Sequence, residues 1–225
     1  MNIIYLIDFN CPYSYIGINR LKKAIANLDL DVEWEIKSFE LEPLVRKESV
    51  SAIERYAEKL NITEKEAEEK LIEIEKIASD DGLEMNFKDM TLRSSKDAHR
   101  LCKFIQSKYS EDTLGLVEEI FKANFVENEN IADNKVLTKI AVSCGIDAEE
   151  AEKILENNYY NIEVELDRDE ALTHSITSTP CFIISEKGER LIIPGAFSAE
   201  DFETALKDLN EGNLESKSYG MGTLQ

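Results

Sequence analysis

Positive charge is scarce in this sequence of 225 residues, which has 26 lysines and arginines against 46 aspartates and glutamates. The resulting net charge of −20 repels phosphate backbones and anionic lipid headgroups. No local cluster of basic residues departs from this average. The composition therefore argues against nucleic acid or a membrane surface as a partner.

Long hydrophobic runs are also absent. The run from Ile3 to Ile7 is far shorter than the roughly 20 apolar residues that a membrane-spanning helix needs. The N-terminus has neither the basic segment nor the small-residue cleavage site of a secretory signal. We therefore expect a cytoplasmic protein without a membrane anchor.

Cysteine is sparse and dispersed. The chain has four cysteines, Cys11, Cys102, Cys144 and Cys181, none of them in a paired spacing. Zinc clusters and disulfide frameworks both need such spacing, so the sequence predicts neither, and no metal site. Each thiol has to be considered separately.

The chain does contain material for a core, with 43% hydrophobic and 32% charged residues. Residues 2–9 form an apolar run typical of a central strand, and helical spacing follows from Pro12, which suits a first helical position. Apolar and charged residues then alternate from Val32 towards Leu41, as in a half-buried strand. The N-terminal order is therefore strand, helix, strand.

A long series of helical patterns follows, with almost no strand pattern, over residues 44–174. Three pairs at or near capping-box spacing predict helix starts: Ser51 with Glu54, Thr63 with Glu66, and Asp147 with Glu150. Gly82 and Gly145 follow apolar stripes, as expected of glycines just beyond a helix. Further helices are predicted over about 95–107, 112–127 and 159–173.

Two short β-rich runs, 181–185 and 191–194, are separated by residues typical of a hairpin, and a last helix is predicted to begin after Ser198. The order β-α-β, helices, β-β-α predicts an α/β layer fold interrupted by a helical insertion. We assign three parts by residue number: a discontinuous α/β domain over 1–43 and 175–212, the insertion over 44–174, and a C-terminal tail over 213–225.

Cys11 is the first candidate for chemistry, because it lies between a strand and the following helix. Backbone N–H groups and the helix dipole favour an anion at that position. A free cysteine has a pKa of about 8.5, and helix N-terminal sites lower it to about 3.5–7.5, so a reactive thiolate is expected. The alternative is a small hydrophobic residue that ends the strand.

Ser14 occupies the position where a second cysteine would complete a redox pair. Its hydroxyl cannot form a disulfide. It can donate a hydrogen bond to the Cys11 thiolate, or it can merely cap the helix, and the sequence leaves both roles open.

Thr179 and Pro180 open the strand after the insertion. A proline there is either an edge feature or part of a cis peptide bond, because it cannot donate to a central ladder. The cis interpretation gains weight from the Cys11 element.

Three segments together resemble the thioredoxin superfamily, and specifically the FrnE-type oxidoreductases of its DsbA-like branch, in which a helical domain interrupts the thioredoxin fold. They are Asp8–Gly17, Asp97–Leu101, and Ser178–Phe182 with Pro194–Ala196 downstream. The first segment is the most specific, and the resemblance covers nearly the whole chain. Its Pro-Tyr-Ser stretch is also similar to kappa-class glutathione transferases and 2-hydroxychromene-2-carboxylate isomerases, with Cys11 where those enzymes have serine.

The resemblance implies that Cys11 is the nucleophile and that Pro180 is cis and packs against it. It also implies that Thr179 offers its backbone to a bound thiol or peptide, beside Pro12 and Tyr13. Ser14 departs from the pattern, since members with a full redox pair have cysteine there.

Two further residues have alternative interpretations. Cys181 follows Pro180 and is either a resolving thiol for Cys11 or a buried core residue. His99 lies next to an apolar helix face and is either a structural histidine or a substrate-binding residue, because the resemblance places its helix over the active-site cleft.

We therefore expect a thiol-disulfide oxidoreductase with one active-site thiol at Cys11, stabilised by Ser14. Its substrate would be a thiol or disulfide, either a small molecule or a protein cysteine. No tightly bound cofactor is predicted, although glutathione or another low-molecular-weight thiol is a possible co-substrate. The alternatives are a glutathione-dependent isomerase or transferase and a non-catalytic binding module, and a homodimer is possible for any of them.

Overall fold

The computed structural model describes residues 1–43, 50–110 and 113–213. The chain forms two compact units, and each is described here by itself. The first unit comprises Met1–Leu41 and the chain from Glu165 onward, and the second comprises Glu42–Val164. Apart from two very short strands, the elements follow the predicted order.

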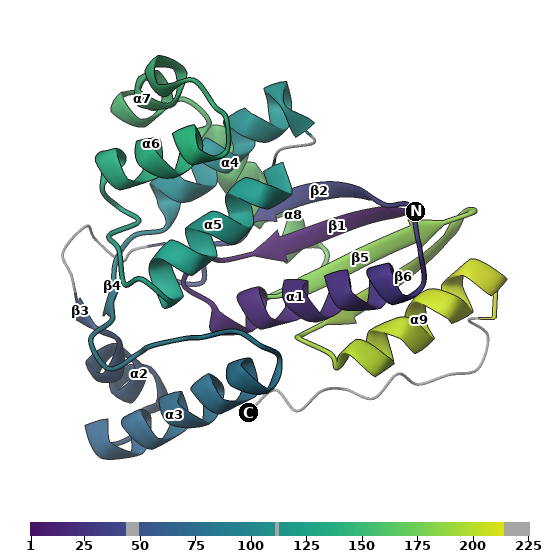
Figure 1. Cartoon of the computed structure of the whole chain (residues 1–225), viewed down its shortest axis with the longest axis horizontal. Helices are drawn as coiled ribbons and strands as arrows, with labels where there is room; N and C mark the ends of the chain where they lie inside the picture. The colour runs from purple at the N-terminus through teal and green to yellow at the C-terminus, as the bar shows by residue number, and fades with distance from the viewer. Residues whose placement is uncertain (44–49, 111–112, 214–225) are drawn as a thin grey trace. The chain divides into compact units, whose positions relative to one another are not determined.

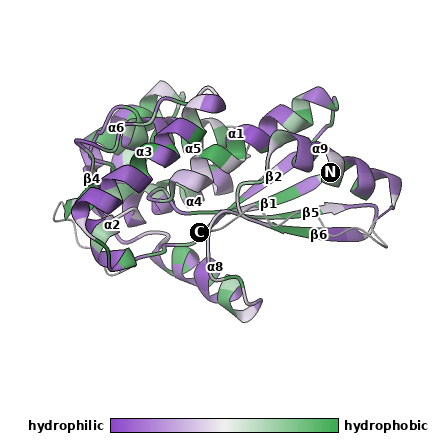
Figure 2. Ribbon diagram, turned by 90° about the horizontal axis from the view of Figure 1, so that it is seen from below, coloured by the Kyte–Doolittle hydropathy of each residue, from purple (hydrophilic) through white to green (hydrophobic). Residues whose placement is uncertain are grey.

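A four-stranded sheet forms the centre of the first unit (Figure 1). Its strands are β2 (Glu33–Ser38), β1 (Asn2–Ile7), β5 (Cys181–Glu186) and β6 (Glu189–Pro194), in that spatial order. β1 runs parallel to β2 and antiparallel to β5, and β5 is antiparallel to β6. The central strands are mostly apolar because helices cover both faces, and Figure 2 shows β5 as hydrophobic over much of its length.

Helices lie on both faces of this sheet (Figures 1 and 2). α1 (Pro12–Asn27) and α9 (Ala199–Glu211) pack against each other on one face. α8 (Asn161–Thr173) lies on the other face, with its residues from Glu165 belonging to this unit. This is the α/β arrangement with a helical insertion that the sequence predicts.

The two faces have separate apolar cores. On the α1 face, the ring of Phe182 stacks on Tyr5 with centroids 4.7 Å apart and meets the ring of Phe202 edge-on at 5.3 Å. On the α8 face, a buried cluster contains Leu6, Phe39, Ala171, Cys181 and Ile183. Because successive strand residues point to opposite faces, neighbours such as Cys181 and Phe182 belong to different cores.

The boundary between the units differs from the predicted one. The sequence pattern assigns 1–43 and 175–212 to the α/β domain, whereas the second segment of this unit begins at Glu165. The physical reason lies in α8, where the buried Asp167 carboxylate accepts the backbone N–H of Ser38 at 2.8 Å. A helical pattern alone does not reveal which unit a helix packs against.

The predicted C-terminal elements also form. Lys187 and Gly188 both have positive φ, 51° and 88°, as a two-residue hairpin turn requires. Ser198 caps α9 by accepting the backbone N–H of Asp201. Beyond residue 213, the predicted tail 213–225 lies outside the described residues.

The second unit is mainly helical. Its helices are α2 (Ala52–Leu60), α3 (Glu64–Asp80), α4 (Lys96–Lys108), α5 (Thr113–Phe125), α6 (Asn134–Ser143) and α7 (Ala148–Glu156). Two strands that the sequence analysis misses, β3 (Val50–Ser51) and β4 (Thr91–Leu92), pair antiparallel. Two residues are too few to produce a recognisable alternating pattern.

Most of the predicted helix ends are present. Thr63 forms a reciprocal capping box at the start of α3, and the Asp147 carboxylate caps α7. Ser51 is the N-cap residue of α2, but its side chain makes no capping hydrogen bond. Gly82 and Gly145 adopt φ values of 82° and 84° after α3 and α6, which explains why glycine occurs there.

Two features are absent from the part of the chain that the structure describes. No helix there is long and apolar enough to cross a membrane. Nor do three or more histidine, cysteine, aspartate or glutamate side chains gather where they could hold a metal ion.

Arg100 joins α4 to α7 and to the segment after α7 within the helical unit. Its side chain is buried and donates to the carbonyl oxygens of Tyr159, at 2.7 Å, and Ile154, at 2.5 Å, and also to that of Asn157. The Asp97 carboxylate, 2.7 Å away, balances its charge. This part of the segment that resembles DsbA-like proteins is therefore a structural support.

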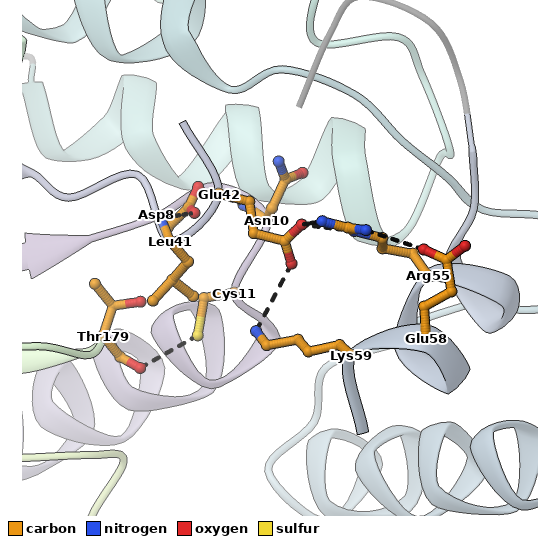
Figure 3. Close-up of polar contacts among 9 residues, drawn as sticks. All are labelled: Asp8, Asn10, Cys11, Leu41, Glu42, Arg55, Glu58, Lys59 and Thr179. Atoms are coloured by element: carbon orange, nitrogen blue, oxygen red, sulfur yellow. Dashed lines mark hydrogen bonds and ion pairs between the residues drawn. The ribbon is translucent and has the colours of Figure 1, made fainter. Parts of the chain in front are cut away.

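We predict that Arg100→Ala lowers the free energy of unfolding by about 3–5 kcal/mol, because it removes the buried guanidinium that pairs with a partly buried carboxylate and donates to three carbonyl groups. Guanidinium denaturation measures the loss. Arg55→Ala is the control, since the partly exposed pair of Arg55 with Glu42 should contribute less than about 1 kcal/mol (Figure 3). Equal losses in the two variants would contradict the assigned role of Arg100.

Candidate active site

Cys11 lies at the N-cap of α1, as the sequence predicts. β1 ends at Ile7, and the backbone N–H of Cys11 donates to the Asp8 carbonyl at 3.0 Å, which closes the turn into the helix. Pro12 is the first helical residue, where its missing N–H costs nothing. The thiol therefore lies at the end of α1 where unpaired backbone N–H groups point outward.

The pairing of β1 with β5 places Thr179 beside Cys11. Leu6 is opposite Cys181 in this antiparallel register, so the end of β1 meets the start of β5. The Thr179–Pro180 peptide bond is cis, as the resemblance implies. The Cys11 thiol donates a hydrogen bond to the carbonyl oxygen of Thr179 at 3.3 Å (Figure 3).

Gly17 allows α1 to lie close to the Pro180 segment. A Cβ atom on Gly17 would come within 3.2 Å of Cγ of Pro180 and of Cζ of Phe182. The Phe182 ring is held by the rings of Tyr5 and Phe202, so it has little room to move. The absence of a side chain at position 17 therefore sets the spacing between α1 and the strand.

Ser14 is fully buried in the first turn of α1. Its carbonyl oxygen accepts a hydrogen bond from the Tyr5 hydroxyl, which fixes this turn to β1. Within the described residues its own hydroxyl makes no hydrogen bond, although it lies close enough to the Cys11 sulfur to favour the ionised thiol. The hydroxyl of Thr179 is likewise buried and without a described partner.

The expected lowering of the Cys11 pKa is wrong for this structure. Burial, which leaves Cys11 only 5% exposed, raises the pKa of the thiol, and the negative charge of Asp8 acts in the same direction. The neighbouring polar groups of Thr179 and Ser14 act to lower the pKa but do not offset burial. Cys11 is therefore a protonated thiol at rest, consistent with its donating to the Thr179 carbonyl.

The structure brings together only part of the predicted site. Cys11, Ser14, Thr179 and Pro180 belong to the first unit and lie around the sulfur, and the neighbouring Pro12 and Tyr13 are partly exposed. His99 lies on α4 of the helical unit, where it is fully buried. Its predicted role in substrate binding stays a prediction.

Cys181 lies in the buried cluster on the α8 face of the sheet. Burial raises its pKa to about 11, which leaves little thiolate at neutral pH. Strand alternation directs its side chain to the face opposite α1. This environment is that of the core residue, which was the alternative to a resolving thiol.

Asp8 is a buried residue at this site to which the sequence analysis assigned no role. It is 1% exposed, and its carboxylate accepts the backbone N–H groups of Asn10 at 3.0 Å and of Leu41 at 2.8 Å. The available signal was an acidic residue at the end of an otherwise apolar strand. The sequence pattern shows that an acidic residue at this position is unusual, but it does not show which groups the carboxylate binds.

Comparison with known proteins identifies the family. The model of the DSBA-like thioredoxin domain matches residues 2–207, which is most of the chain. This chain belongs to the DsbA-like thioredoxin family. The sheet with its cis-proline segment and helical insertion is therefore the DsbA-like fold that the sequence predicts.

Three known proteins illustrate the similarity. The Bacillus subtilis protein YwbO, described as uncharacterized, is 28% identical over 210 residues, covering 89% of this chain and 93% of its own. A probable DsbA oxidoreductase from Streptomyces coelicolor is 27% identical, with a TM-score of 0.85 and coverage of 97% and 93%. A 2-hydroxychromene-2-carboxylate isomerase, with 16% identity, a TM-score of 0.68 and coverage of 97% and 100%, shares the fold.

We predict that Gly17→Ala destabilises this DsbA-like protein, although alanine favours a helix over glycine by about 0.8–1.0 kcal/mol. The new methyl group would press on Pro180 and Phe182 and shift α1. Gly115→Ala is the control, because a Cβ atom there meets nothing within 4 Å and should stabilise α5. Thermal denaturation of both variants measures the difference, and stabilisation by both would disprove the close contact.

The buried thiol of Cys181 predicts a loss of stability at alkaline pH. Between its unfolded pKa near 9.0 and its folded value of about 11, only the unfolded chain releases the proton. The free energy of unfolding should therefore fall with rising pH, by about 1.4 kcal/mol per pH unit from this thiol. Denaturation from pH 8 to 11 should show a shallower fall in Cys181→Val. An unchanged slope would contradict the prediction.

Proposed function

We propose that this protein catalyses thiol-disulfide exchange through the single active-site thiol of Cys11. The observation that carries the proposal is the position of the sulfur, at the N-terminus of α1 and hydrogen-bonded to the residue before the cis proline. Membership of the DsbA-like family supports thiol chemistry. Ser14 in place of a second cysteine supports a mechanism through mixed disulfides.

In the proposed reaction, the Cys11 thiol loses its proton to solvent and the thiolate attacks one sulfur of a substrate disulfide. The bond between the two substrate sulfurs breaks, one leaves as a thiolate, and the other remains bonded to Cys11. A second, external thiolate then attacks this mixed disulfide. Cys11 leaves as a thiolate, and a new disulfide between the external thiol and the substrate is released.

The buried hydroxyls of Ser14 and Thr179 are the proposed donors to the Cys11 thiolate. Both belong to residues that favour the ionised sulfur, and neither hydroxyl has another hydrogen-bond partner among the described residues. A hydroxyl can rotate its proton towards a new negative charge. On ionisation, Cys11 would thus lose its hydrogen bond to the Thr179 carbonyl, and the thiolate would accept hydrogen bonds from the two hydroxyls instead.

A mechanism with one active-site cysteine also needs an external thiol to resolve the mixed disulfide. Cys181 lies in the core with its pKa raised to about 11, so we assign the resolving step to a low-molecular-weight thiol such as glutathione. Such a step needs a reducing compartment, and a cytoplasmic location is part of the proposal. Pro12, Tyr13, Thr179 and Pro180 are the proposed contacts of the bound thiol or peptide.

The proposal predicts that Cys11→Ser abolishes both exchange and the mixed disulfide with glutathione, because the attacking sulfur is lost. Ser14→Ala should slow exchange at pH 7 by about tenfold, the effect of one hydrogen bond to a charged group. The measurements are exchange rates with glutathione disulfide and site-resolved mass spectrometry of the adduct. Cys144→Ser, which removes a partly exposed thiol of the helical unit, should change neither.

Exchange that survives in Cys11→Ser would overturn the proposal. If the wild-type protein formed no adduct with any thiol, the alternatives would gain: a glutathione-dependent isomerase or transferase if glutathione still binds, and a binding module if it does not. Calorimetric titration with glutathione separates those two outcomes.

A further inference from the structure

Asp8 is an ionisable residue buried beside the candidate nucleophile. It follows the last residue of β1 and is 1% exposed. A carboxylate in such a place needs hydrogen-bond donors to compensate for lost water. The backbone N–H groups of Asn10 and Leu41 supply two, one to each carboxylate oxygen (Figure 3).

These two hydrogen bonds join the nucleophile's turn to the end of a neighbouring strand. Asn10 directly precedes Cys11, and the Cys11 N–H is bound by the carbonyl of Asp8 itself. Leu41 lies just beyond β2, which continues alongside β1 through the bond from the Phe39 N–H to the Ile7 carbonyl. Asp8 thus holds the turn that precedes Cys11 in place from both sides.

The charge of Asp8 also acts on the sulfur. Charged residues on the elements around this end of the sheet include Lys37 in β2, Glu40 just after β2, and Asp167 on α8. Lys37 is paired with Glu170 at 2.5 Å and lies 3.9 Å from Asp167. Asp8 is the charged group whose field opposes ionisation of Cys11.

We propose that Asp8 is a positioning residue that sets the reactivity of Cys11: its hydrogen bonds fix the turn that presents the sulfur to the Thr179 carbonyl, and its buried negative charge, three residues before Cys11, adds to the effect of burial on that sulfur. This inference rests on Cys11 as the reactive thiol of the proposed function. It concerns the protonation of that thiol and not the identity of its substrate.

The test compares Asp8→Asn with Asp167→Asn. Both carboxylates are buried, and each accepts a backbone N–H from the end of β2 or just beyond it at 2.8 Å, but Asp167 does not act on the Cys11 sulfur. The rate of Cys11 alkylation by iodoacetamide is measured from pH 6 to 11 by mass spectrometry. The reagent is neutral, so the loss of a charge from the protein does not alter its approach.

In Asp8→Asn, the midpoint of the pH profile should move to lower pH, with alkylation about threefold faster at pH 7. The plateau rate at high pH should be slower, because a thiolate of lower pKa is less nucleophilic. Simple loosening of the turn would instead speed alkylation at every pH. Asp167→Asn should leave both the midpoint and the plateau unchanged. An unchanged or higher midpoint in Asp8→Asn would overturn the inference.

Two further measurements cover the possibility that Asp8→Asn fails to fold. Asp8→Glu retains the charge and should keep the high midpoint. In the wild-type protein, the amide hydrogens of Asn10 and Leu41 should exchange slowly, and rapid exchange of both would refute the hydrogen bonds. Alkylation needs no disulfide substrate, so the pH profile of alkylation tests the role of Asp8 even if the protein shows no exchange activity. Conversely, exchange activity can be present when Asp8→Asn leaves the alkylation midpoint unchanged.

Discussion

The antiparallel pairing of β1 with β5 is the constraint on which the candidate site depends. It brings Cys11 to the carbonyl of Thr179, 168 residues further along the chain. The entropic cost of closing a loop rises only with the logarithm of its length, about 0.6 kcal/mol per doubling. A long helical insertion between the two strands therefore adds little to the cost of pairing them, and the residues described around the Cys11 sulfur belong to the first unit.

The register of that pairing also decides what the residues of β5 do. With Leu6 opposite Cys181, Phe182 points to the α1 face and supports the helix that carries Cys11, while Cys181 enters the opposite core. A slip by one residue would exchange the two faces. The separation of the Cys181 thiol from the Cys11 thiol is thus a consequence of strand geometry. The close packing at Gly17 depends on the same register, because its neighbours are Pro180 and Phe182.

The sequence was sufficient to predict the order of elements, the N-cap position of Cys11 and, through the family resemblance, the cis proline. These features depend on local patterns: an apolar run, a proline at a first helical position, a threonine-proline pair before a strand. The association of α8 with the first unit was not predictable, because it rests on contacts distant in sequence: Asp167 binds Ser38, 129 positions away, and Ala171 lies in a cluster with Leu6 and Phe39. The protonation of Cys11 was missed because its burial is a tertiary feature, although Asp8 lies only three residues away in the sequence.

The balance of effects at Cys11 has a consequence for the proposed exchange. A helix N-terminus contributes about 0.3–1 kcal/mol to an anion, whereas full burial can shift a pKa by several units, so burial prevails. A thiol of raised pKa is seldom ionised, but its thiolate is a strong nucleophile and a poor leaving group. On the proposed function, the mixed disulfide at Cys11 would therefore persist until an external thiolate attacks the partner's sulfur and Cys11 leaves as a thiolate. Such a site is suited to forming a mixed disulfide with one half of a substrate disulfide. It is poorly suited to acting as a strong oxidant, because a strong oxidant needs a stabilised thiolate.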